Sequence, residues 1–299
     1  MFFDLGKGVR SLFWTWFFGI AAGCCLSVLV FFLIWGRWFR VASHTVLMPN
    51  LPKEFDGFRI AMISDLHDRR FGKNNSALVK AILNTRPDLV VTAGDLHEGR
   101  RPTAGIFGLF SGLSASVPVT YTEGNHDFRV TSWGITEAEY LQYLDDLSRH
   151  GATLLNNTAV PMERNGKILF LYGQSWKGME SGKNPEIDPG SPSILVCHDP
   201  LQFDRLESLP DLMLSGHVHG GILRLPWIGP VFAPGNGLPL WKRIGRRFFF
   251  PKYSRGLYYK GKHTLAVTQG VGFFVLPIRF LRPEIMVLTL KSDEKLNNS

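Results

Sequence analysis

Residues 58–67 read FRIAMISDLH, an apolar run that ends in Asp65 and His67. Two more runs of this kind follow, LVVTAGD at 89–95 and VPVTYTEGNHD at 117–127. Short runs rich in Val, Ile and Leu are typical of buried strands in a sheet that is covered on both faces. In open α/β sheets, ligand sites form at the carboxyl ends of the strands. The polar residues that end these runs are therefore expected to meet at one edge of a sheet.

Strand and helix patterns alternate along the rest of the chain. We predict strands at 59–64, 89–93, 117–122, 168–172, 194–197, 212–215, 264–268 and 285–290. Helices are predicted at 74–84 and 137–149. The second helix has Thr136 as its N-cap, Glu139 as the capping-box partner and Gly151 just past its end. This alternation predicts a layered α/β fold in one large domain at 58–291.

The N-terminal region contains a long uncharged segment. Residues 11–35 hold no charged side chain across 25 positions, which is long enough for a helix that spans a bilayer. A cleaved signal peptide has a shorter apolar stretch, so a transmembrane helix is the favoured interpretation. Lysines and arginines flank both ends, so the charge rule does not assign the side. We therefore divide the chain into a flank at 1–10, this helix, a linker at 36–57, the domain and a polar tail at 292–299.

The charge of the chain is concentrated in one segment. The 33 Lys and Arg exceed the 25 Asp and Glu by 33 − 25 = 8, and residues 241–262 alone hold eight basic and no acidic side chains. The remainder is balanced, which argues against an extended nucleic-acid-binding face. The three cysteines imply no disulfide framework.

Metal-binding residue types recur at the ends of the predicted strands. The segments concerned are Asp65-x-His67, Gly94-Asp95, Gly124-Asn125-His126-Asp127, His198-Asp199 and Gly216-His217-x-His219. Any one of them alone is an ordinary turn or a hydrogen-bonded histidine, but five in one chain indicate a metal centre. Asp, Asn and His ligands without thiolate favour Mn²⁺, Fe²⁺ or Zn²⁺.

In this order, the five segments resemble the calcineurin-like metallophosphoesterases over residues 58–290. Two C-terminal segments, 250–258 and 277–285, are similar to the bacterial membrane-associated branch, which includes an envelope phosphodiesterase-like group and a transmembrane UDP-2,3-diacylglucosamine pyrophosphatase. The resemblance implies a four-layer α/β/β/α sandwich behind the N-terminal helix, and a single-pass location in the bacterial inner membrane.

The resemblance also implies two divalent metal ions, with Mn²⁺ favoured. One ion is expected on Asp65, His67, Asp95 and His219, and the other on Asp95, Asn125, His198 and His217. His126 is expected to contact the substrate phosphate and protonate the leaving oxygen, with Asp127 holding its ring. Every ligand position of the family pattern is filled, which favours an active enzyme.

Three further residues near these segments are candidates for substrate binding. Arg69 and Arg70 follow His67 closely enough to reach a phosphate, or are solvated loop arginines. His97 stands where relatives commonly carry Asp two residues after Gly94-Asp95, and is either an extra substrate contact or a loop residue with access to solvent.

Basic and aromatic residues alternate after the last histidine segment. Lys242, Arg243, Arg246 and Arg247 lie among Trp and Phe residues, a composition typical of a surface on an anionic bilayer. The alternative is that the aromatic side chains pack into the core and the cations are solvated.

These observations predict a membrane-anchored phosphoester hydrolase that acts on an amphiphilic envelope phosphodiester or pyrophosphate such as UDP-2,3-diacylglucosamine. The expected partners are the lipid bilayer and a phosphoester substrate, not nucleic acid. Two alternatives stay open: a broad-specificity phosphodiesterase or phosphatase on soluble substrates, and a membrane scaffold without catalysis.

Overall fold

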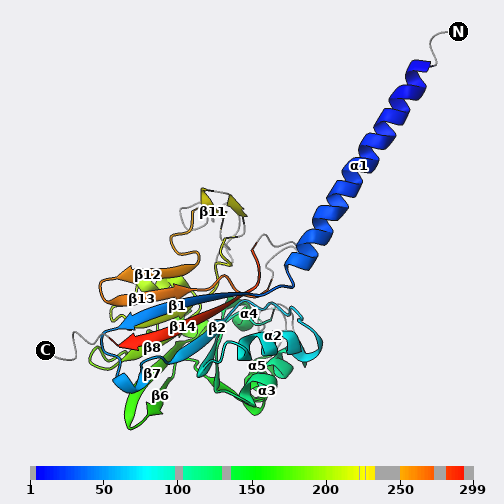
Figure 1. Ribbon diagram of the computed structural model, residues 1–299. Helices are drawn as coiled ribbons and strands as arrows, with labels where there is room; N and C mark the ends of the chain where they lie inside the picture. The colour runs from blue at the N-terminus through cyan, green and yellow to red at the C-terminus, as the bar shows by residue number, and fades with distance from the viewer. Residues whose placement is uncertain are drawn as a thin grey trace.

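The computed structural model describes residues 5–97, 104–129, 136–221, 223–225, 227–232, 250–272 and 281–292. Two six-stranded sheets face each other beneath one long N-terminal helix (Figure 1). The order of strands in the first sheet is β1 (Arg40–Met48), β14 (Glu284–Ser292), β2 (Arg59–Ile63), β3 (Leu89–Ala93), β4 (Val119–Thr122) and β5 (Ala152–Leu154). The order in the second is β12 (Gly256–Lys260), β13 (His263–Val267), β9 (Leu212–Ser215), β8 (Ser193–Cys197), β7 (Lys167–Gln174) and β6 (Ala159–Arg164).

Within each sheet, the central strands are parallel to one another. Strands β2 to β5 run in one direction in the first sheet, and β7, β8, β9 and β13 run in one direction in the second. The antiparallel pairings are β14 with β2 and the outer pairs β6 with β7 and β12 with β13. All eight predicted strands are present, with ends that differ by up to two residues.

Apolar side chains fill the space between the layers. Met62, Val91 and Met286 of the first sheet pack with Ile194 and Leu212 of the second, and all are buried. The other face of the first sheet is covered by α2 (Ser76–Leu83), α3 (Ala104–Ser114) and α5 (Glu137–Arg149). The outer face of the second sheet is covered by the short helix η4 (Pro200–Asp204) and irregular segments near Ile187 and Tyr253. The α/β/β/α sandwich is thus present, with a thin fourth layer.

The capping box of α5 is confirmed. The hydroxyl of Thr136 accepts a hydrogen bond from the Glu139 backbone N–H, and the Glu139 carboxylate accepts one from the Thr136 N–H. Helix α3 was not predicted, because its sequence is rich in Gly, Leu and Phe without a polar face. The remaining helices are α4 (Asn125–Arg129), α6 (Trp176–Glu180), η1 (Lys53–Phe55) and η2 (Lys73–Asn75).

The linker predicted at 36–57 is wrong, because this range contains β1. This nine-residue strand pairs in parallel with β14 along its whole length, from Arg40 beside Glu284 to Met48 beside Ser292. It is an edge strand with one buried face, formed by Ala42, Val46 and Met48. Its polar residues Ser43, His44 and Thr45 interrupt the apolar sequence and hid the strand from a search for continuous apolar runs. β5, β6 and β12 were missed for a related reason, since each lies at the edge of its sheet and has exposed or half-buried side chains.

Helix α1 (Leu5–Trp35) extends away from the domain (Figure 1). Its segment Ser11–Phe31 has a mean hydropathy of 1.9, and none of it is buried in the fold. The helix is long and apolar enough to cross a membrane. Only four residues separate its end from β1; we call these residues, 36–39, the junction.

Candidate metal centre

The predicted ligands lie on turns directly after strands of both sheets. Asp65 and His67 follow β2, Asp95 follows β3, Asn125 begins α4 after β4, His198 follows β8, and His217 and His219 follow β9. Several of them have left-handed backbones, with φ of 53° at Asp65, 47° at His67, 55° at Asp95, 72° at His217 and 53° at His219. Such conformations cost free energy in non-glycine residues and gather at functional sites. The fold therefore stores backbone strain where the ligands converge.

Two glycines of the motifs are required by close approach. A Cβ atom on Gly94, whose φ is +83°, would lie 2.6 Å from Nδ1 of His198. A Cβ atom on Gly124 would lie 2.2 Å from Oδ1 of Asp95. The absence of both side chains lets the turn after β3 approach His198 of the second sheet and the turn after β4 approach Asp95.

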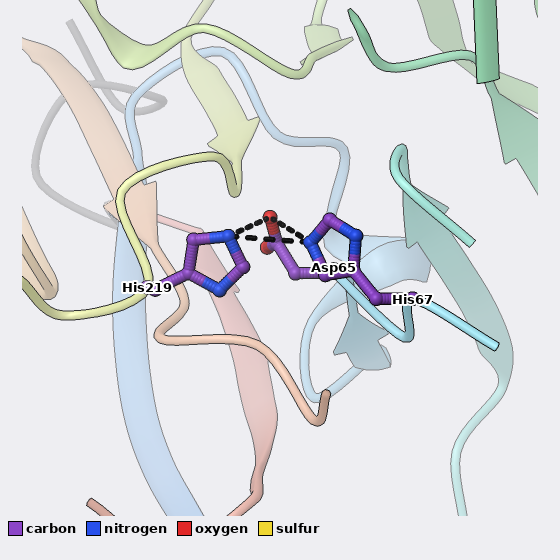
Figure 2. A group of neighbouring side chains, drawn as sticks. All are labelled: Asp65, His67 and His219. Carbon is purple, nitrogen blue, oxygen red and sulfur yellow. Dashed lines mark hydrogen bonds and ion pairs between the residues drawn. The ribbon is translucent and has the colours of Figure 1, made fainter. Parts of the chain in front are cut away.

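The first group of ligands consists of Asp65, His67 and His219, whose donor atoms lie within 4.8 Å of one another. Figure 2 shows the two imidazoles turned toward the carboxylate between them. The Nε2 atoms of His67 and His219 are 3.3 Å apart, and Oδ1 of Asp65 is 3.4 Å from the latter. The Asp65 carboxylate also accepts hydrogen bonds from the Ser64 hydroxyl and the His217 backbone N–H. These contacts fix Asp65 between the two sheets.

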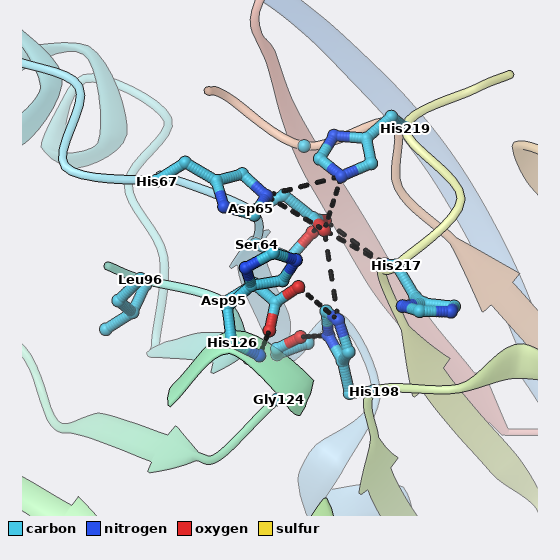
Figure 3. Close-up of polar contacts among 12 residues, drawn as sticks. Ser64, Asp65, His67, Asp95, Leu96, Gly124, His126, His198, His217 and His219 are labelled. Atoms are coloured by element: carbon cyan, nitrogen blue, oxygen red, sulfur yellow. Dashed lines mark hydrogen bonds and ion pairs between the residues drawn. The ribbon is translucent and has the colours of Figure 1, made fainter. Parts of the chain in front are cut away.

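The second group consists of Asp95, His198 and His217. In Figure 3 Nε2 of His198 points at Asp95, 3.0 Å from its Oδ2. Nδ1 of His198 lies 2.6 Å from the carbonyl oxygen of Ala93, an acceptor that places the proton on Nδ1 in the neutral ring. This arrangement leaves Nε2 with a lone pair for a metal ion, and it is the outer-shell contact that metal-binding histidines usually have.

Charges within the second group stabilise one another when no metal is bound. Burial opposes ionisation of Asp95, but the imidazoles of His198, His126 and His67 outweigh it and hold the pKa of Asp95 well below its usual value. Burial likewise disfavours the charged imidazole of His198, yet the carboxylates of Asp95 and Asp65 raise the pKa of His198 to about 10. A cation at this position would replace that proton.

The surroundings of Asn125 indicate whether the residues of the site are suited to a metal ion. Its side chain is 3% exposed, and its Oδ1 atom has no hydrogen-bond partner among the residues that the structure describes. A buried amide oxygen without a partner costs free energy. Amide and carboxylate oxygens together with imidazole nitrogens suit divalent cations. The donor set therefore fits two ions. Asp95 belongs to the second group and also lies, with His126, within 4.8 Å of the donor atom of His67 from the first group.

His126 lies at the centre of the site, with its ring edge-on to that of His67 at a centroid distance of 4.9 Å. Its backbone N–H donates to Oδ1 of Asp95 at 2.8 Å. This places His126 beside both ligand groups, as expected for a residue that contacts the substrate phosphate.

Asp127 lies against the backbone of two of the turns that carry the predicted ligands. Its carboxylate accepts hydrogen bonds from the backbone N–H groups of Asp95 (2.7 Å), Leu96 (3.0 Å), His97 (3.4 Å) and Gly124 (2.9 Å). Asp127 thus fixes the turn that carries Asp95, and its predicted role in holding the His126 ring stays a prediction. Burial raises the pKa of Asp127, an effect that the nearby His97 imidazole opposes. No sequence pattern indicated this contact, because the amides from the turns after β3 and β4 come together only in the folded chain.

The candidate substrate residues differ in their positions. Arg69 donates from one guanidinium nitrogen to the Gly36 carbonyl and from the other to the Val271 carbonyl at 3.2 Å, so it ties the junction to the site instead of facing a phosphate. Arg70 is exposed, and its predicted phosphate contact stays a prediction. His97 is fully buried, 3.8 Å from Asp127 and with its ring against Tyr143. The loop position with access to solvent is therefore wrong for His97, and its buried ring offers no surface to a substrate.

A tryptophan that we did not predict forms part of the wall of the site. The Trp176 ring lies 5.5 Å from the ring of His217 and 6.1 Å from that of His198, and its Nε1 donates to Glu180 at 2.8 Å. Nothing in its sequence context pointed to it. The predicted membrane-surface residues Lys242, Arg243, Arg246 and Arg247 lie outside the described residues.

Comparison with known proteins agrees with this geometry. The model of the calcineurin-like phosphoesterases matches residues 58–221, which include all seven predicted ligands. The chain belongs to the calcineurin-like phosphoesterase family. It is 29% identical to the metallophosphoesterase YkuE of Bacillus subtilis over 85% of this chain and 86% of the relative. It is 28% identical to the phosphodiesterase YaeI of Escherichia coli over 85% of this chain and 88% of the relative. A solved structure of the phosphopantetheinyl hydrolase of Mycobacterium tuberculosis is similar over 73% of this chain and 91% of its own, with a TM-score of 0.43 and 14% identity.

As a calcineurin-like phosphoesterase, the protein is a metal-dependent phosphoester hydrolase of a family that uses a dinuclear divalent centre, and its clusters of Asp and His side chains could hold such ions. The two cations, when bound, supply positive charge to the phosphate and lower the pKa of water. The chain itself orients the ligands through the Ala93, Ser64 and Asp127 contacts. His126 is the residue predicted to donate a proton to the leaving oxygen, and this role stays a prediction.

Proposed function

We propose that the protein is anchored in the membrane by α1 and hydrolyses a phosphodiester or pyrophosphate that is part of an amphiphilic envelope molecule. UDP-2,3-diacylglucosamine is the most specific form of this proposal. Supporting it are the length and hydropathy of α1 and the exposure of its apolar side chains. The relative YaeI is named a phosphodiesterase, which favours a diester over a monoester.

The observation that carries the proposal is the direct connection between α1 and the metal-binding loop. Arg69, two residues after the ligand His67, donates to the carbonyl of Gly36 in the junction. Its guanidinium lies 4.6 Å from the centre of the Phe71 ring, which packs against Phe39 at 4.7 Å. A helix that only set the location of the enzyme would need no contact with this loop.

A second arginine holds the junction from the other side. Arg282 donates to the carbonyl of Phe39 at 2.6 Å and to that of Trp38 at 3.1 Å, and its guanidinium lies 5.5 Å from the Trp35 ring. Both arginines bind backbone carbonyls next to the end of α1. With α1 in a bilayer, the metal centre would lie close to the headgroups, where the phosphate of a lipid-linked substrate is found.

We further propose Mn²⁺ as the metal, with Fe²⁺ or Zn²⁺ as alternatives, because the ligands include oxygen and imidazole donors but no thiolate. Purified protein treated with a chelator and then supplied with each ion separates these possibilities. The ion that restores the highest turnover of bis-p-nitrophenyl phosphate at equal occupancy is the one supported.

The decisive experiment compares lipid-linked and soluble substrates. The full-length protein in detergent is assayed on UDP-linked diacylated sugars, on the same headgroups without acyl chains, and on soluble nucleotide diesters, with Asp95→Asn as the inactive control. We expect a higher kcat/KM on the acylated substrates. Equal rates on the soluble compounds would support a phosphodiesterase without lipid preference. No turnover of any phosphoester with both metals bound would support the scaffold.

A further inference from the structure

We propose that the tip of the β10–β11 hairpin enters the interfacial layer of the bilayer that α1 crosses and forms a second attachment of the domain to the membrane. The hairpin consists of β10 (Leu223–Leu225) and β11 (Gly229–Phe232), which pair antiparallel. We call Trp227 and Ile228 the hairpin tip. This inference rests on the proposed anchoring by α1.

The hairpin tip exposes large apolar side chains to an unusual degree. Trp227 is 103% exposed and Ile228 is 63% exposed, and Phe250, which donates its backbone N–H to Val231 of β11 at 2.9 Å, is 63% exposed. Adjacent exposed apolar side chains mark contact surfaces more often than single ones do. Indole rings favour the boundary between lipid and water, so the residue types suit a bilayer surface.

The backbone holds these side chains outward. Trp227 has a φ of 60°, and Gly229, two residues later, has a φ of 90°. A left-handed conformation is uncommon for a bulky residue and marks a tight turn or a functional constraint. Here it places the indole at the end of the hairpin, away from the core.

The hairpin projects from the side of the domain that α1 also leaves (Figure 1). The contacts of Arg69 and Arg282 with the junction limit how α1 can swing relative to the domain. The surface around the helix end therefore faces the bilayer, and the hairpin tip extends toward it. Helix α5, which carries the exposed Leu141, lies away from the hairpin, at the far end of the domain in the view of Figure 1.

The hairpin is also connected to the metal centre. β10 begins four positions after the ligand His219, and Gly220 and Gly221 lie between them. A lipid contact at the hairpin tip would thus set the position of the loop that carries His217 and His219. The metal centre would then lie at the same level as the phosphate groups of the lipids.

Spin labels in the full-length protein in nanodiscs test this inference. The background replaces Cys24 and Cys25 with alanine, while the buried Cys197 is retained. Single labels are placed by Ile228→Cys at the hairpin tip, by Val30→Cys in α1 and by Leu141→Cys on α5. Collision rates with dioxygen, which concentrates in lipid, and with a water-soluble nickel chelate report the depth of each label.

We expect the ratio of dioxygen to nickel collisions to be several-fold higher at position 228 than at position 141, and highest at position 30. A ratio at 228 equal to that at 141, with the label at 30 in lipid, overturns the hairpin contact and leaves the anchor intact. Nickel access at position 30 equal to that at 141 overturns the anchoring proposal and, with it, this inference. The two failures are therefore distinguishable.

Discussion

His198 from the second sheet lies 3.0 Å from the carboxylate of Asp95 from the first. The Ala93 carbonyl fixes the other nitrogen of the imidazole, and the four backbone amides bound by Asp127 fix the turn of the carboxylate. This contact joins the two halves of the metal centre. Its properties determine the expectations below for Asp95, for metal affinity and for the pH dependence of stability.

Replacing Asp95 with asparagine is expected to remove metal binding and activity together. The substitution keeps the shape of the side chain but removes the charge that both ligand groups share. Loss of an outer-shell contact alone costs about 10- to 100-fold in affinity or activity, so loss of Asp95 should cost more than about 100-fold in kcat. Metal content by mass spectrometry and turnover of bis-p-nitrophenyl phosphate measure the two effects. Asp145→Asn on the exposed face of α5 is the matched control, and equal metal content in both variants would refute the shared-ligand role.

Replacing His126 with alanine is expected to lower kcat by about 10²- to 10⁴-fold, the usual contribution of a general acid, and to leave the metal content unchanged. The loss should be larger for substrates with alkyl leaving groups than for p-nitrophenyl esters, because p-nitrophenolate leaves without protonation. Rates on a series of leaving groups check this. A loss that is the same for every leaving group would assign His126 to phosphate binding alone.

Metal affinity is expected to fall as the pH is lowered. The pKa of His198 is raised to about 10 in the metal-free protein by the carboxylates of Asp95 and Asp65, against the effect of burial, so a metal ion must displace its proton. Below that pKa, each unit of pH should cost up to about tenfold in affinity. Titration calorimetry in buffers of different ionisation enthalpy measures the protons released. Release of no proton at pH 7 would contradict the expectation.

The same pair determines how the stability of the metal-free protein depends on pH. The raised pKa of His198 stabilises the fold fully below its unfolded value of 6.5, and this contribution is lost as the pH rises through about 10. The lowered pKa of Asp95 stabilises the fold above its unfolded value of 3.8, and that contribution is lost as the pH falls through the folded value. Thermal unfolding of chelator-treated protein should therefore show less alkaline dependence in His198→Gln than in the wild type.

Arg69 and Arg70 are expected to respond differently to replacement by alanine. Arg69→Ala removes the donors to the Gly36 and Val271 carbonyls, which should lower the free energy of unfolding by about 1–3 kcal/mol with little change in KM for a soluble diester. Arg70→Ala should leave stability unchanged, and should raise KM if this exposed side chain contacts the substrate phosphate. Denaturant unfolding and steady-state kinetics on both variants measure this. A raised KM with unchanged stability in Arg69→Ala would restore its phosphate contact.

The central strands, the N-terminal helix and the candidate metal ligands could be predicted from residue types and their spacing alone. Buried parallel strands are read as apolar runs because both of their faces are covered, and the ligands stand at the ends of those runs because strand ends are where side chains converge. The edge strand β1 was not predicted. Only side chains of its inner face are buried, so its sequence contains no continuous apolar run. Its pairing with β14, more than 240 positions away, had no local signal.

The residues that support the site, and those that connect it to α1, could be identified only in the folded chain. Asp127 binds amides from the turns after both β3 and β4, Arg69 binds carbonyls of the junction and of Val271, and His97 is buried behind Asp127. A side chain's residue type and spacing indicate what it can bind. The partner it does bind depends on which backbone groups the fold leaves within reach, because a hydrogen bond forms only over about 3 Å.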